Sequence, residues 1–238
     1  MLFNKSGYFF IVLLFIAVIG FWNSYFSIFF HDIDEYPQLT ELEAYVHFHA
    51  ASMLFWLAML ISQAFLIRFN QRSLHKTIGK FSYLLVPFIV ISLILLAHSQ
   101  ITIHDFGITY GRLYVLFLQL SLLVIFMIAY SLAIVNRHTP ARHARYMICT
   151  ALTLIDPAVA RLPIDIPSLP FSYQVVTFAI TDLILIILII MERNKQKGRE
   201  VFPIMLGVFL FFQIINLTLT RSQIWDDFAL WFARLPLT

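Results

Sequence analysis

The fold of this chain is decided by the residues from Tyr45 to Pro87, which read YVHFHAASMLFWLAMLISQAFLIRFNQRSLHKTIGKFSYLLVP. Two apolar runs lie in this stretch, and a helix needs about 20 such residues to cross a bilayer. A short basic turn that contains His75 joins the runs. Because backbone groups in hydrocarbon must find partners within their own element, the stretch predicts a transmembrane helical hairpin.

The composition extends this prediction to the rest of the chain. Of its 238 residues, 61% are hydrophobic and 12% are charged, whereas a soluble domain carries about 25% charged residues. This deficit of charge indicates that lipid bilayer surrounds most of the protein surface. The net charge of +3 comes from basic residues scattered over short turns, so no nucleic-acid partner is predicted.

The apolar runs predict an all-α, polytopic membrane protein that forms a single transmembrane domain over residues 1–238. We expect seven transmembrane helices, at about 8–30, 45–67, 79–99, 111–135, 145–162, 172–191 and 202–220. The second to fifth spans, about 45–162, are expected to form a four-helix core. The first span is longer and bulkier than the core of a signal peptide, so we expect it to be retained.

The distribution of basic residues predicts the orientation. Twelve of the sixteen Lys and Arg residues lie before the first span or in the turns after the second, fourth and sixth spans. The positive-inside rule therefore predicts a cytoplasmic N-terminus and an outside C-terminus in a bacterial inner membrane. Aromatic residues recur at near-helical spacing between Ser222 and Thr238, which predicts a short helix in the outer interface.

Polar side chains within the spans are costly in lipid and are expected to face the bundle interior. In the second span one stripe carries His49, Ser52, Trp56 and Gln63, and His47 points roughly the opposite way. Sorted by depth, an inner group contains His75, His138 and His143. The outer group contains His47, His49, His98, His104, Arg112, Asp156, Arg161, Asp182, Asn216 and Arg221. The simplest alternative is that histidines and arginines at helix ends only contact headgroups or backbone.

The first chemical interpretation of these groups is b-type haem. Haem iron in a membrane bundle is commonly held between two imidazoles from facing helices. The predicted inner pair is His75 with His143, and the outer pair is His49 with His98 or His104. Two haems placed in this way would carry electrons across the bilayer to a redox partner or a quinone. The predicted supporting residues are Arg112, Arg161, Gln63, Trp56 and Asn216.

The second interpretation is a zinc-dependent hydrolase at the outer leaflet, with His49, His98 and either Asp156 or Asp182 as ligands. Zinc binds imidazole and carboxylate, and a catalytic site leaves one position for water. A tight ligand motif such as H-E-x-x-H does not occur, so these ligands would come from different helices. The third interpretation is a non-catalytic membrane protein that serves binding, assembly or transport.

A resemblance favours the haem interpretation. The stretches HAASMLFW, QAFLIR and LHKTIGKFSY between His49 and Tyr83, and NRHTPARHARYMICTALTLIDPAVAR from Asn136 to Arg161, resemble a group of uncharacterised bacterial multi-pass membrane proteins. The same hairpin is distantly similar to di-haem transmembrane reductases of the cytochrome b type. That resemblance implies that His49, His75 and His143 are haem ligands. The chain departs from the family at Tyr110–Arg112, where the family has a further histidine.

Overall fold

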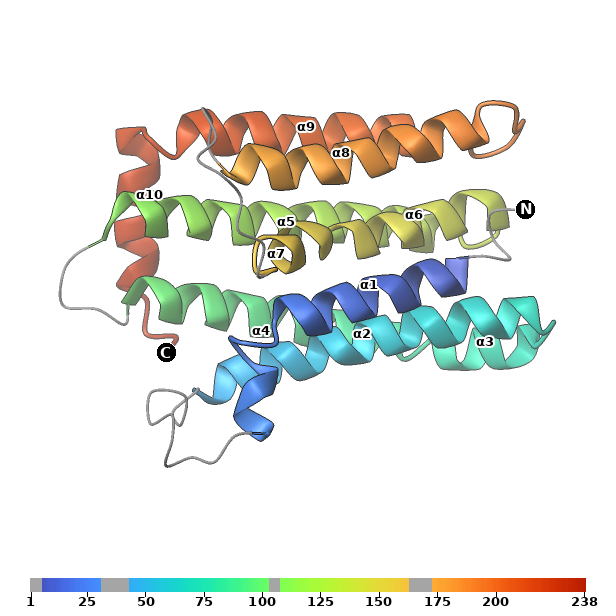
Figure 1. Ribbon diagram of the computed structural model, residues 1–238, viewed down its shortest axis with the longest axis horizontal. Coiled ribbons are helices and arrows are strands. Elements are labelled where there is room, and N and C mark those ends of the chain that lie inside the picture. Colours follow the sequence, from blue (N-terminus) through green and yellow to red (C-terminus); the bar gives the residue numbers. More distant parts are fainter. Residues whose placement is uncertain (1–5, 31–42, 103–107, 163–172) are drawn as a thin grey trace.

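The computed structural model describes residues 6–30, 43–102, 108–162 and 173–238, and these residues form helices joined by turns (Figure 1). In chain order the elements are α1 (Ser6–Gly20), η2 (Phe26–Phe29), α2 (Ala44–Arg68), α3 (Arg72–Gly79), α4 (Ser82–Thr102), α5 (Tyr110–Val135), α6 (Pro140–Leu152), α7 (Ile155–Val159), α8 (Tyr173–Glu192), α9 (Val201–Leu219) and α10 (Gln223–Ala233). The all-α class predicted from the sequence is therefore confirmed.

Five segments within the described residues are long and apolar enough to cross a membrane. They are α2, the α3–α4 unit from Arg72 to Thr102, α5, α8 from Gln174 to Glu192, and α9. These segments agree with five of the predicted spans. The predicted spans at 8–30 and 145–162 are not among them, so the count of seven is not confirmed.

The predicted first span is shortened because its helix ends at Gly20. Glycine has low helix propensity, and here it also lets two backbones touch. A Cβ atom on Gly20 would lie 2.2 Å from the carbonyl oxygen of Ala158 in α7. After Gly20 the chain turns and forms only the short 3-10 helix η2. The first apolar run thus packs against the bundle over 15 residues, which is less than a full bilayer crossing.

The predicted fifth span is divided into α6 and α7 by Thr153 and Leu154. Pro157 explains the break, because proline cannot donate a backbone hydrogen bond to the residue four positions earlier, here Thr153, and its ring crowds that turn. By contrast, Pro87 lies near the start of α4, which continues through it to Thr102. The break places the buried Asp156 at the beginning of α7.

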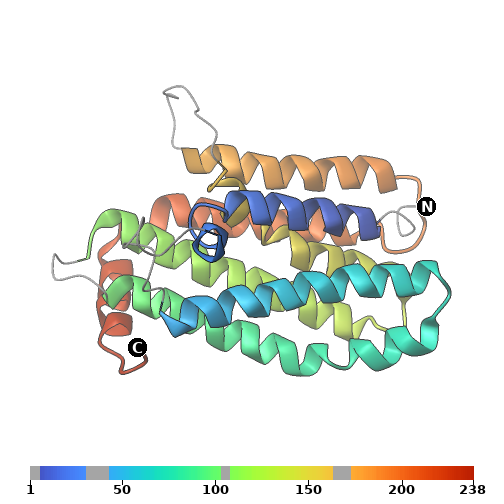
Figure 2. The same ribbon diagram turned by 60° about the horizontal axis from the view of Figure 1, so that its bottom comes forward.

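The helices run side by side, and the turns between them collect at two ends (Figures 1 and 2). The turns α2–α3, α5–α6 and α8–α9 lie at one end, which we call the basic end because these turns, α3 with its flanks and the adjoining helix ends carry most of the Lys and Arg residues. Helix α10 runs across the opposite end, which we call the α10 end. The grouping of the basic turns agrees with the sequence prediction. The side of the membrane that each end faces stays a prediction.

Between these ends, the middle of the bundle is filled by an aromatic cluster centred on Trp56. Its indole is fully buried, and its ring centre lies 5.1 Å from that of Phe126 and 5.9 Å from that of Tyr130. Ser52 and Gln63, which share the predicted stripe with Trp56, are buried as well. The helical phase of α2 was therefore predicted correctly.

Candidate functional site

Two histidines from separate parts of the chain meet at the basic end. The ring centres of His75 in α3 and His143 in α6 are 6.4 Å apart, and the ring planes are perpendicular at 88°. An ion bound at about 2.0–2.1 Å from a nitrogen of each imidazole would hold the ring centres about 6 Å apart. The spacing therefore suits two imidazoles on opposite sides of one ion. It also suits an ordinary edge-to-face ring contact.

The ring nitrogens of the two histidines have different surroundings. Nδ1 of His143 lies 2.9 Å from the carbonyl oxygen of Ala133 in α5. A carbonyl can only accept, so Nδ1 donates the proton and Nε2 carries the free lone pair. Metal-binding histidines are commonly held in this way by a backbone carbonyl. Nδ1 of His75 is buried and has no hydrogen-bond partner among the described residues.

The surroundings of the pair add a second unsatisfied group. Gln63 in α2 is buried, and neither atom of its side-chain amide has a hydrogen-bond partner in the described part of the chain. Tyr130, one turn before Ala133 on α5, shares a hydrogen bond of 2.9 Å with Ser82. The exposed cations of this end, Arg72, Lys76 and Lys80, lie in or next to α3.

The donor atoms fit axial ligation of haem iron, but the packing around them is closed. A tight aromatic cluster of Tyr130, Trp56 and Phe126 begins one helical turn from Ala133, the partner of His143. A porphyrin that surrounds the axis between the two imidazoles needs these rings to shift. The pair thus supplies ligand atoms and orientation, whereas the space for the macrocycle requires rearrangement.

The other histidines of the predicted site have different neighbours. Nδ1 of His49 lies 3.2 Å from Oγ of Ser92, whose hydroxyl donates to the Ile89 carbonyl, so His49 is the donor and its Nε2 is left over. Nδ1 of His98 lies 2.6 Å from Oγ1 of Thr238, and its ring packs against Phe232 of α10. His49 of α2 therefore faces α4, whereas His98 of α4 faces α10.

Two further histidines complete the predicted outer group. His47 contacts Tyr25, with 3.1 Å between Nδ1 and the phenol oxygen, at the edge of the bundle and away from Ser92. His104 lies outside the described residues. The structure therefore brings together the inner pair but gives His47, His49 and His98 three separate partners. The outer haem stays a prediction.

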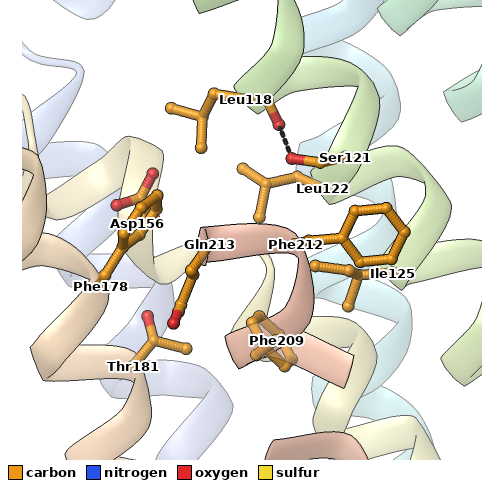
Figure 3. Close-up of a pocket in the computed structure, with 10 residues that line it drawn as sticks. All are labelled: Leu118, Ser121, Leu122, Ile125, Asp156, Phe178, Thr181, Phe209, Phe212 and Gln213. Carbon is orange, nitrogen blue, oxygen red and sulfur yellow. Dashed lines mark hydrogen bonds between the residues drawn. The ribbon is translucent and has the colours of Figure 1, made fainter. Parts of the chain in front are cut away.

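A small cavity with a mostly apolar lining and a few polar side chains lies between α5, α7, α8 and α9 (Figure 3). It holds about 10 Å³, which is about the room for one water molecule. Asp156 lines it and accepts a hydrogen bond of 2.8 Å from Gln174 on Oδ1. Its Oδ2 is buried with no hydrogen-bond partner among the described residues, and the same holds for Oγ1 of Thr181 across the cavity.

Asp182, the other carboxylate of the zinc interpretation, is linked to this cavity through Gln213, whose Nε2 donates to Oδ1 of Asp182 over 3.2 Å. Arg161 stacks on Phe21 at 4.7 Å and donates to the Pro157 carbonyl over 2.9 Å. Within the described residues, no three His, Cys, Asp or Glu side chains gather as a metal site would require. The zinc site stays a prediction.

Asn216 in α9 is fully buried, and neither atom of its side-chain amide finds a partner in the described residues. Gln213 and Thr220, which lie on the same side of the chain's last predicted span by helical spacing, are buried too.

The sequence reasoning missed a buried ion pair at the basic end. Arg145 in α6 pairs with Glu192 at the end of α8, and their side chains are only 2% and 3% exposed. Arg145 was counted only as a basic residue of a turn. The sequence contained a signal for this pair. Glu192 and Glu200 are acidic residues next to the otherwise basic turn between the last two predicted spans, and each of them pairs with an arginine, since Glu200 pairs with Arg142.

The chain was compared with protein-family models, curated proteins and solved structures, and no match was found in any of the three.

Proposed function

We propose that this integral membrane protein binds a b-type haem between His75 and His143 and uses it for electron transfer at the basic end of the bundle. The observation that carries the proposal is the 6.4 Å contact between the two imidazoles, which come from α3 and α6. The distant similarity of the α2–α3 hairpin to di-haem cytochrome b-type reductases favours the same function.

The residues of the chain would act as follows. The Ala133 carbonyl holds Nδ1 of His143 as a donor, so that Nε2 keeps its lone pair for a ligand bond. His75 offers its unpartnered Nδ1. The cations of α3 and its flanks suit the negative propionates of a haem. A bound haem supplies one-electron reduction and oxidation at its iron, with a potential set by its ligands and its burial.

The test is an optical titration of the purified protein in a mild detergent with haem, before and after reduction with dithionite. The expected result is a saturable Soret band at one haem per chain and reduced bands of a low-spin bis-imidazole haem. His75→Ala and His143→Ala should each abolish these bands. His138→Ala is the matched control, because His138 lies in the turn just before α6 and is exposed, and it should leave the spectrum unchanged.

A second readout follows the packing. Because Trp56 lies in the aromatic cluster that must open, haem binding should quench its fluorescence, and Trp56→Phe should lose that part of the change. If both histidine variants bind haem with the wild-type spectrum, the assignment of the inner pair is wrong. A wild-type protein that fails to bind haem at all would remove the proposed function.

A further inference from the structure

A second, larger cavity lies away from the histidine pair, near the α10 end. It is formed by the last turns of α4 and the first turns of α5, and it has a volume of about 380 Å³. Pockets that bind small ligands typically hold about 300–1,000 Å³. The cavity is therefore large enough for a phosphate group together with part of the molecule that carries it.

The cavity contains a cation, Arg112, that has no salt bridge within the described part of the chain. Arg112 lines it, and Nη1 of its guanidinium is buried with no hydrogen-bond partner among the described residues. On the same wall Nε2 of Gln119 donates to Oε1 of Gln100 over 2.8 Å. Among the described residues, none that lines the cavity is acidic. A buried N–H without an acceptor is costly, so the cavity lacks a negatively charged acceptor.

The start of α5 adds positive potential to the same place. The backbone N–H groups of Arg112 and Leu113 both donate to the Thr109 carbonyl, so the N–H groups that precede them begin the helix without intrahelical partners. The space at Gly111 is open, because an added Cβ would have no described atom within 4 Å. The positive end of the helix dipole therefore adds to the positive potential of the guanidinium, and both attract an anion.

The rest of the cavity lining is largely apolar and includes Ile101 of α4 and, one turn after Arg112 on α5, Val115 and Leu116. Both α4 and α5 belong to segments long enough to span a bilayer, and the cavity lies where one ends and the other begins. A cation without a described salt bridge, beside an apolar lining at the end of two spans, matches the headgroup and upper acyl chain of a lipid.

We propose that this cavity binds the phosphate group of an anionic phospholipid from the leaflet at the α10 end, with Arg112 as its anchor and the acyl chain along Val115 and Leu116. The inference is independent of haem binding. Arg221 lies near the same helix start, where it stacks on Tyr110 at 5.3 Å and Nε donates to the phenol oxygen over 3.2 Å. It is not among the cavity residues, which makes it a matched control.

The experiment uses the full chain in a neutral detergent, titrated with phosphatidylglycerol, phosphatidylcholine or inorganic phosphate. Bound lipid is counted by native mass spectrometry, and the melting temperature is recorded in parallel. We expect one tightly bound phosphatidylglycerol per chain and a rise in melting temperature. Arg112→Gln should weaken binding about tenfold or more, as expected for the loss of one charge-assisted hydrogen bond. Arg221→Gln should bind as the wild type does.

A second variant keeps the charge and fills the space. Val115 is partly exposed, at 38%, so Val115→Trp is expected to fold and to block the acyl-chain wall, and it decides the question if Arg112→Gln does not fold. The proposal is overturned if both variants bind phosphatidylglycerol as tightly as the wild type. It is also overturned if phosphatidylcholine binds equally well, or if inorganic phosphate alone gives the full thermal shift, which would indicate a site for a free anion.

Discussion

Replacement of Glu192 by Gln tests the buried ion pair at the basic end. Arg145 and Glu192 join α6 to the end of α8 with side chains that are almost fully buried. The variant keeps the size of the side chain but removes the negative charge, so the guanidinium stays buried without a counter-ion. Loss of one partner from such a pair costs about 3–5 kcal/mol. We therefore expect Glu192→Gln to lower the free energy of unfolding by about that amount.

The second ion pair of this end provides the control. Nε of Arg142 lies 2.6 Å from Oε1 of Glu200, but the two side chains are 49% and 39% exposed. Exposed pairs contribute about 0–1 kcal/mol because water screens both charges. Glu200→Gln is the same chemical change at the same end of the bundle, and it should cost no more than about 1 kcal/mol.

The assay is reversible unfolding in mixed micelles, followed by circular dichroism, on the wild type and both variants. A third variant, Arg145→Met combined with Glu192→Leu, removes both charges. It should recover most of the loss, because a buried pair is often no more stable than apolar residues of similar volume. If Glu192→Gln destabilises the protein no more than Glu200→Gln does, then Arg145 is solvated or paired elsewhere, and the reasoning from burial is wrong.

Three further predictions concern helix contacts and pH. Gly20→Ala should destabilise the protein by about 1–3 kcal/mol in the same assay, because the new methyl group would overlap the Ala158 carbonyl, whereas Gly207→Ala, with no described atom within 4 Å, should not. Trp225→Phe should cost about 0.5–1.5 kcal/mol, since it loses the indole hydrogen bond to the backbone of α5; an unchanged stability would show that this bond does not hold α10. A hydrogen bond from its own backbone and the guanidinium of its arginine partner hold the pKa of Glu200 below its ordinary value of 4.5. The stability difference between wild type and Glu200→Gln should thus be present above pH 4.5 and vanish as the pH falls through that lowered pKa; a difference that persists in acid would contradict an ionic origin.

The sequence predicted the helices and their buried faces because both depend on local composition and period. Span length was less predictable. The apolar runs at 8–30 and 145–162 look long enough to cross a membrane, yet Gly20 and Pro157 end or interrupt the helices within them. Both interruptions serve one tertiary contact, the close approach of α1 to α7, and hydropathy contains no information about such a contact.

Part of the candidate site was also predictable. His75 and His143 each follow a basic turn, so topology alone places both at the same end, and the structure brings their rings into contact. The outer group was harder, because depth along a span does not specify direction around the helix. His98 lies six residues after Ser92, and six residues turn a helix by about 600°, well away from the starting face. Consequently Ser92 contacts His49 while His98 faces α10.

The two proposed sites share one physical feature, a buried polar atom without a hydrogen-bond partner. Most buried polar groups in folded proteins find a partner, and each one left without a partner costs about 1–3 kcal/mol. Among the described residues such atoms occur on His75 and Gln63 at the basic end and on Arg112 and Gln119 beside the large cavity, but also elsewhere, for example on Asp156, Thr181 and Asn216. A ligand that supplies the missing hydrogen bond would recover part of the lost stability. Each proposal therefore rests on unsatisfied atoms together with a second observation, the ring contact of the histidine pair or the volume of the cavity.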